Sequence, residues 1–143
     1  MTKKSKKYTL TLDVEETYRM IGICSHHIDY RLVWGINNEL NSNFIKAENL
    51  FQIFGKKGVV VSEHSYYTFF DDENEINYYL IKNKSSNHYL IPEKVEFDYL
   101  FFICDDHYDL QKNIINKLKN VSSVLTASEL DTSEIKSTDN INF

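Results

Sequence analysis

The sequence predicts an α+β fold, an antiparallel sheet of about four to five strands with two or three helices packed on it. Residues 59–70, 76–83 and 95–104 are rich in branched and aromatic side chains, which favour strands. The acidic stretch DDENE, residues 71–75, joins the first two of these segments and indicates an antiparallel hairpin. Elsewhere apolar residues recur at helical spacing, so both kinds of element are expected in one domain.

Three elements are expected in the first forty residues. Residues 8–12 alternate apolar and polar side chains, which predicts a half-buried strand. An acidic capping pattern then precedes a short helix predicted over about residues 14–24, although YRMIGI could also be extended. A clearer helix follows and ends near Leu40. Its apolar stripe consists of Ile28, Leu32, Ile36 and Leu40, widened by Val33.

The later elements include the centre of the sheet. Residues 44–54 fit neither the helical nor the strand period, so their type stays open. Residues 95–104 carry apolar side chains on both faces, which predicts a central strand covered on both sides. Asp106 can cap a helix that follows, and residues 121–127 resemble a last strand.

Composition places the chain among ordinary soluble globular proteins. We expect a flexible basic tail over residues 1–7, a single α+β domain over 8–130 and a disordered acidic tail over 131–143. The chain is 42% hydrophobic and 26% charged, and no apolar run is long enough for a membrane span. The N-terminal lysines are followed by TLTLDVEE rather than by the apolar stretch of a signal peptide, so we expect a cytoplasmic protein.

The charge distribution bears on partners. The chain has a formal net charge of -5 and only two arginines, Arg19 and Arg31, whereas a nucleic-acid binder would carry a basic patch on its fold. We therefore expect no nucleic-acid partner, with the lysines of the N-terminal tail as the one reservation. The lack of a long apolar run predicts no membrane partner either. The oligomeric state cannot be predicted from these features.

Cysteine and histidine residues suggest one alternative function. Cys24 and His26 in one segment, with Cys104 and His107 in another, are residue types that bind zinc, and together they could form a metal or enzyme site. Their spacing matches no zinc motif, however. The other interpretation is that the cysteines are buried thiols rather than a disulfide and the histidines are exposed at helix starts. We expect no cofactor.

A protein-binding role is the main expectation. Glycine-rich nucleotide loops and nucleophile motifs are absent from the sequence, so a non-enzymatic adaptor is favoured over an enzyme. Four tyrosines on the predicted hairpin could form a partner surface, although tyrosines are also ordinary cross-strand stabilisers. They are Tyr66, Tyr67, Tyr78 and Tyr79.

One stretch resembles a known family. Ile91, Pro92 and Glu93 are followed, after three further residues, by Phe97, Asp98 and Tyr99. This pattern resembles the motif that names the IPExxxVDY family of small bacterial proteins, with phenylalanine in the place of valine. Residues 29–37 and 83–92 are also similar to that family, and the likeness covers roughly residues 8–105. The resemblance implies a cytoplasmic bacterial protein and no established activity.

Within this stretch, Asp98 calls for a partner. Pro92 suits a strand edge or a turn, whereas Asp98 is predicted on an inward face, where a carboxylate needs a charged or hydrogen-bonding partner. Arg31 is the first candidate and Arg19 the second. Removing a deeply buried partner of this kind would cost roughly 3–5 kcal/mol. A functional role for Glu93, Asp98 and Tyr99 is the alternative to this structural one.

Overall fold

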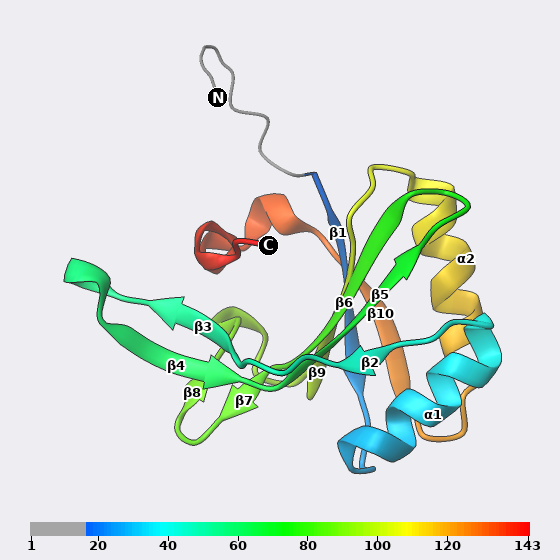
Figure 1. Cartoon of the computed structure of the whole chain (residues 1–143), viewed down its shortest axis with the longest axis horizontal. Helices are drawn as coiled ribbons and strands as arrows, with labels where there is room; N and C mark the ends of the chain where they lie inside the picture. Colours follow the sequence, from blue (N-terminus) through cyan, green and yellow to red (C-terminus); the bar gives the residue numbers. More distant parts are fainter. Residues whose placement is uncertain (1–16) are drawn as a thin grey trace.

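The computed structural model describes residues 17–143, and within them the chain forms a six-stranded antiparallel main sheet with two α-helices on one face (Figure 1). The predicted α+β architecture is thus confirmed, with one strand more than expected. The strands run across the main sheet in the order β10-β1-β9-β6-β5-β2. Their bounds are Thr126–Leu130 (β10), Arg19–Cys24 (β1), Tyr99–Ile103 (β9), Ile76–Lys82 (β6), Tyr66–Asp71 (β5) and Ile45–Lys46 (β2).

The helices α1 (Asp29–Leu40) and α2 (Tyr108–Leu118) cover one face of the main sheet and close a first core with it. Leu32, Val33 and Ile36 of the predicted stripe are buried, as an amphipathic helix requires. The helix after residue 106 is also confirmed, but its cap is not. His107, not Asp106, occupies the cap position of α2, and it forms no side-chain hydrogen bond to the helix. The Asp106 carboxylate instead accepts a hydrogen bond from Arg19.

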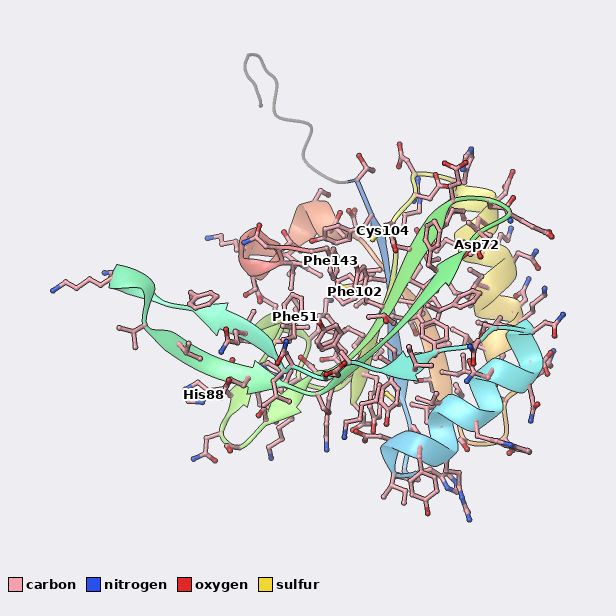
Figure 2. All side chains as sticks on the ribbon, in the orientation of Figure 1. Phe51, Asp72, His88, Phe102, Cys104 and Phe143 are labelled. Atoms are coloured by element: carbon pink, nitrogen blue, oxygen red, sulfur yellow. The ribbon has the colours of Figure 1, made fainter. Side chains whose placement is uncertain are left out.

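A second core lies on the opposite face of the main sheet, beneath several short elements. The small hairpin of β3 (Phe51–Phe54) and β4 (Val60–His64) contributes Phe51 and Ile53, and a second hairpin, formed by β7 (Lys84–Ser85) and β8 (His88–Tyr89), leads into the buried residues Leu90 and Ile91. The remaining cover consists of short 3-10 segments, η2 (Pro92–Lys94), η3 (Thr132–Glu134) and η4 (Lys136–Asn140). Figure 2 shows Phe51, Phe102 and Phe143 gathered between these elements and the main sheet.

The central position of β9 confirms the prediction for residues 95–104. Every residue of β9 is buried, because β1 pairs with it on one side and β6 on the other while a core covers each face. The alternation begins only at Tyr99, however. Asp98 lies just outside the strand and is exposed, and the Phe97 ring packs in the second core with Leu100 rather than on the side of Tyr99.

The helix predicted over residues 14–24 is wrong for the described part of that range, where residues 19–24 form β1. Met20 packs in the second core while Ile21 and Ile23 pack in the first, so a chain with apolar side chains on both sides suits an inner strand. Pairing with β9 and β10, both distant in sequence, outweighs the local helical pattern. The predicted strand over residues 8–12 and the basic tail over 1–7 lie outside the described residues.

The segment predicted as one strand over residues 59–70 divides at Ser65 into β4 and β5. The expected antiparallel pairing with residues 76–83 is correct for β5, which pairs with β6. In contrast, β4 pairs with β3, whose residues belong to the segment that sequence patterns left untyped. We call this β3–β4 hairpin and its turn, residues 51–64, the arm; it extends from the body of the molecule in Figure 1.

The end of the chain packs on the protein. Residues 131–143 were predicted as a disordered tail, but they contain η3 and η4 and bury Ile135 and Ile141 in the second core. The Phe143 ring stacks on Tyr79, with centroids 4.1 Å apart. The last strand begins at Thr126 rather than at residue 121. No helix among the described residues is long and apolar enough to span a membrane.

Candidate functional site

Asn83 organises the segment that resembles the family motif. Its side chain is fully buried, with its amide nitrogen 2.9 Å from the carbonyl oxygens of Lys94 and Phe97 and its amide oxygen accepting from the Ile91 N–H at 3.0 Å. The Asn83 backbone adds a bond in each direction, to Asp98 and from Leu90. Asn83 therefore closes residues 90–98 into one loop against β6, a role that the sequence did not reveal.

Pro92 and Glu93 fix the next part of the loop. Pro92 lies in the first turn of η2, where a residue without an N–H removes no hydrogen bond. The Glu93 carboxylate accepts from the Ser137 N–H at 3.1 Å and from its hydroxyl at 2.6 Å, which joins the loop to η4. The Ser137 hydroxyl bond lowers the pKa of Glu93, so this carboxylate stays ionised at neutral pH. Glu93 thus anchors the end of the chain.

Asp98 bonds a backbone amide, not an arginine. Its carboxylate accepts from the Ser25 N–H at 2.8 Å, while its own N–H donates to the Ile23 carbonyl at 2.9 Å. The two contacts hold the chain where it leaves β1. The side chain is exposed, and so the predicted buried ion pair and its penalty do not apply. The partner of Asp98 is therefore a nearby backbone amide, and this bond has a structural role.

The two arginines lie elsewhere. Arg31 is exposed on the outer side of α1, and among residues 17–143 the ion pairs are Arg19 with Asp106 and His107 with Asp105. Arg19 is at the start of β1, the opposite end from Asp98. Its guanidinium also bonds Gln111 and lies 5.5 Å from the centroid of the Tyr108 ring. Neither arginine could therefore serve as the partner of Asp98.

Tyr99 completes the motif with a bond to α1. Its hydroxyl donates to the Asp29 carboxylate in the first turn of α1, which also accepts from the Ser65 hydroxyl at 3.3 Å. Burial, and then the bond to Asp29, raises the pKa of Tyr99. Burial likewise raises the pKa of Tyr67 beside the same carboxylate. This network fastens α1 to β9 and β5.

A hollow of about 620 Å³ lies beside this segment and is lined by Asp29, Asp98 and Tyr99, together with His26 and the lysines Lys82 and Lys84. The two carboxylates and the tyrosine hydroxyl are bonded within the chain, as described above. These polar groups have structural partners, and for that reason the hollow is a weaker candidate for a binding site than its polar residues suggest.

The four tyrosines of the predicted partner surface are covered. Tyr67 and Tyr78 are 8% and 7% exposed in the first core, and burial raises the pKa of Tyr78 to about 12. Tyr66 and Tyr79 point to the opposite side, where their rings pack against Phe51 and Phe143 respectively. With a core on each face of the sheet, Tyr67 and Tyr78 are buried and Tyr66 and Tyr79 are only partly exposed, so the predicted location of the partner surface is wrong.

The alternative metal site is also not formed. Cys24 ends β1, whereas Cys104 follows β9, and because these strands are antiparallel the two residues lie at opposite ends, roughly 20 Å apart. The Cys24 thiol bonds the Glu96 carbonyl, and neither cysteine forms a disulfide. His26 and His107 are exposed, His26 near Cys24 and His107 near Cys104, so they lie at opposite ends as well. No group of His, Cys, Asp and Glu in residues 17–143 is arranged to hold a metal ion.

The outer side of α1 presents a site that sequence reasoning missed. Trp34, the only tryptophan of the chain, is 69% exposed, and Tyr30 one turn earlier is 67% exposed. They border a hollow of about 660 Å³ between α1 and the loop after α2, which we call the α1 groove. Its lining also includes His27, Arg31, Ser122 and Ser123.

Close packing shapes the floor of the α1 groove. A Cβ atom on Gly35 would lie 2.7 Å from a methyl carbon of Val121, so the glycine allows the helix to approach this loop. Val121 and Val124 are buried beneath it, and between them Ser123 is buried as well. The groove is therefore a feature of the packed fold rather than of side chains projecting into solvent. A cue was present in the sequence, since Tyr30 and Trp34 lie one turn apart outside the apolar stripe.

Comparison with known proteins adds no further evidence, because no family model, curated protein or solved structure matches this chain.

Proposed function

We propose that this chain is a non-enzymatic protein-binding module that uses the α1 groove to hold a segment of a partner protein. The observation that carries the proposal is the exposure of Trp34 and Tyr30 at the edge of a formed hollow. Tryptophan, tyrosine and arginine are the residues most enriched at the energetic centres of protein interfaces, and this groove contains all three. The IPExxxVDY resemblance remains a prediction and adds no partner.

The electrostatics of the groove indicate the chemistry of its ligand. In a chain of net charge -5, the residues lining the α1 groove include Arg31 and His27 and no carboxylate. An apolar side chain can pack between the two exposed rings while a neighbouring carboxylate pairs with the guanidinium. The partner we propose is therefore a peptide segment with an acidic residue next to an aromatic or aliphatic one.

Trp34 provides a direct assay because it is the sole tryptophan. Peptides selected from a random display library on the wild-type protein would be synthesised and titrated while indole emission is followed. We expect acidic–apolar peptides that shift the emission to shorter wavelength, and at least about tenfold weaker binding to Arg31→Glu. For Trp34→Ala, binding is followed by calorimetry and should be lost.

Val95→Ala is the matched control, since Val95 is also an exposed apolar residue but lies outside the groove. It should bind the selected peptides as the wild type does. Selection that yields no peptide, or peptides that bind Trp34→Ala and the wild type equally well, would overturn the proposal.

A further inference from the structure

The arm carries a surface that neither the fold nor the α1 groove explains. Four apolar residues in its outer half, Phe54, Val59, Val60 and Val61, are 40–62% exposed. The tip between them is the turn η1 (Lys56–Gly58), with exposed Lys56 and Lys57 that form no ion pair among the described residues. An apolar ribbon with a doubly basic tip is unusual for a surface that only faces water.

The base of the arm is fixed, which gives the tip a defined direction. His64 is fully buried, and its ring nitrogens lie 2.9 Å from the Ser62 hydroxyl and from the Lys82 carbonyl. The Lys82 carbonyl can only accept, so Nδ1 of His64 donates to it and Nε2 accepts from Ser62. Burial lowers the pKa of His64, which keeps the ring neutral in this arrangement. The Phe51 ring adds a contact to Tyr66 on the main sheet.

A surface of complementary character lies at the other end of the molecule. Beside the β5–β6 turn is a hollow of about 590 Å³, which we call the acidic hollow. Phe44, Phe69 and Phe70 provide apolar walls, and Asp71, Asp72 and Glu73 form an acidic rim that outnumbers the single lysine, Lys117.

The rim is negatively charged, and none of its three carboxylates forms an ion pair with the described residues. Asp71 accepts from Asn74 and is held ionised, because that bond lowers its pKa. Asp72 and Glu73 are exposed and form no ion pair with any residue of the described part of the chain. Phe70, next to them, is 49% exposed. The acidic hollow thus has negative charge that complements the arm lysines, and apolar walls against which the exposed apolar residues of the arm can pack.

The two surfaces cannot meet within one copy. Figure 1 shows the arm and the β5–β6 turn at opposite ends of the longest axis, and Figure 2 places Asp72 at the end away from the arm. We propose that the protein self-associates head to tail, with the arm tip of one copy docked in the acidic hollow of the next. When each copy contacts a different neighbour at each of its two ends, this contact extends into rings or chains, whereas a dimer would need two antiparallel copies to form both contacts reciprocally.

Sedimentation velocity of the full chain at low ionic strength tests this proposal. We expect the mass to rise beyond that of a dimer with increasing concentration and to fall when salt is added. Reversing the arm charges (Lys56→Glu with Lys57→Glu) or the rim charges (Asp72→Lys with Glu73→Lys) should leave only monomer. Lys112→Glu, an exposed lysine on α2, is the control and should associate as the wild type does.

The combination of all four substitutions gives the decisive comparison. It restores opposite charges on the arm and the hollow, so it should recover self-association but should not co-assemble with the wild type. If the combined variant stays monomeric, or if the wild type is monomeric at every concentration, the proposal is overturned. It is also overturned if the mass stops at a dimer, which indicates a closed arrangement such as arm-to-arm pairing or reciprocal exchange of arms, or if the arm lysines act only in binding anionic phosphatidylserine vesicles.

Discussion

Residues 91–99 and the outer side of α1 both present aromatic and charged side chains, but they place them in opposite settings. In the first region Glu93, Asp98 and Tyr99 each bond a distant part of the same chain. In the second region Tyr30 and Trp34 are left open to solvent beside a hollow. The difference shows that a distinctive stretch of sequence can stabilise the fold, while the surface that we propose for binding consists of residues that belong to no recognised motif.

Asn83→Ala should have the largest effect on this comparison. It leaves the Ile91 N–H and two carbonyl groups without their partner in a buried loop, and each such group costs about 1–3 kcal/mol. We expect a loss of about 3 kcal/mol or more in the free energy of unfolding, measured by urea denaturation. Asn87→Ala, in the exposed turn of the neighbouring hairpin, is the control and should change it little. Equal stability of the two variants would contradict the role of Asn83.

Gly22→Ala tests how tightly the same segment packs on β1. A Cβ atom on Gly22 would lie 2.6 Å from the Phe97 ring, so the ring must move, at a cost of about 1–3 kcal/mol. Combining it with Phe97→Val, which makes room, should destabilise the protein by less than the sum of the two single changes. Denaturation of all three variants measures this coupling. Strictly additive losses would show that the two residues do not contact each other as described.

Asp98→Ala separates the local bond from a buried ion pair. Loss of the bond to the Ser25 N–H should cost about 1–2 kcal/mol, less than the roughly 3–5 kcal/mol of an orphaned buried charge. Arg31→Ala should be almost neutral, because Arg31 is exposed. A large and equal loss in both variants, with strong coupling between them, would restore the ion pair that the sequence suggested.

Acidification should loosen the contact between Glu93 and the end of the chain, and of the four changes it should affect the stability of the protein least. The pKa of Glu93 is lowered from its ordinary value of 4.5, so its contribution is complete above that value and is lost as the pH falls through the lower pKa of the folded state. The protection factors of residues 132–143, which compare exchange with that of an unstructured chain at the same pH, should therefore fall below pH 4.5, and Glu93→Gln should show lower protection already at neutral pH. Protection that is independent of both changes would contradict the anchoring role.

Sequence patterns predicted the elements whose partners need not be known. The apolar stripe of α1 and the two apolar faces of β9 can be recognised from the local sequence. The spacing of apolar residues along each element shows whether one face or both faces are buried. The strand β1 was mistaken for a helix because its structure depends on pairing with β9 and β10. Even the paired residues that are nearest in sequence, Ile23 and Tyr99, are 76 positions apart.

The candidate site was less predictable than the fold, for a related reason. Asn83 lies in a stretch rich in serine and asparagine that is typical of an exposed loop, and only the folded chain shows that it is buried. The outward position of Trp34 on α1 can be read from the helical period. The hollow beside it cannot, because Ser122 and Ser123 reach it from a loop almost ninety positions later. The alternative metal site could not be judged from the sequence for the same reason, because the sequence does not show that its two cysteine- and histidine-containing segments lie far apart in the fold.

Emission from Trp34, before and after addition of a selected acidic–apolar peptide, is the most direct test of the contrast between the two regions. The exposure of 69% predicts the emission of a water-exposed indole, open to iodide quenching in the free protein. The peptide should shift this emission to shorter wavelength and protect it from iodide, in Asp98→Ala as in the wild type but not in Arg31→Glu. An indole already protected in the free monomer, or one that no peptide affects, would contradict the account.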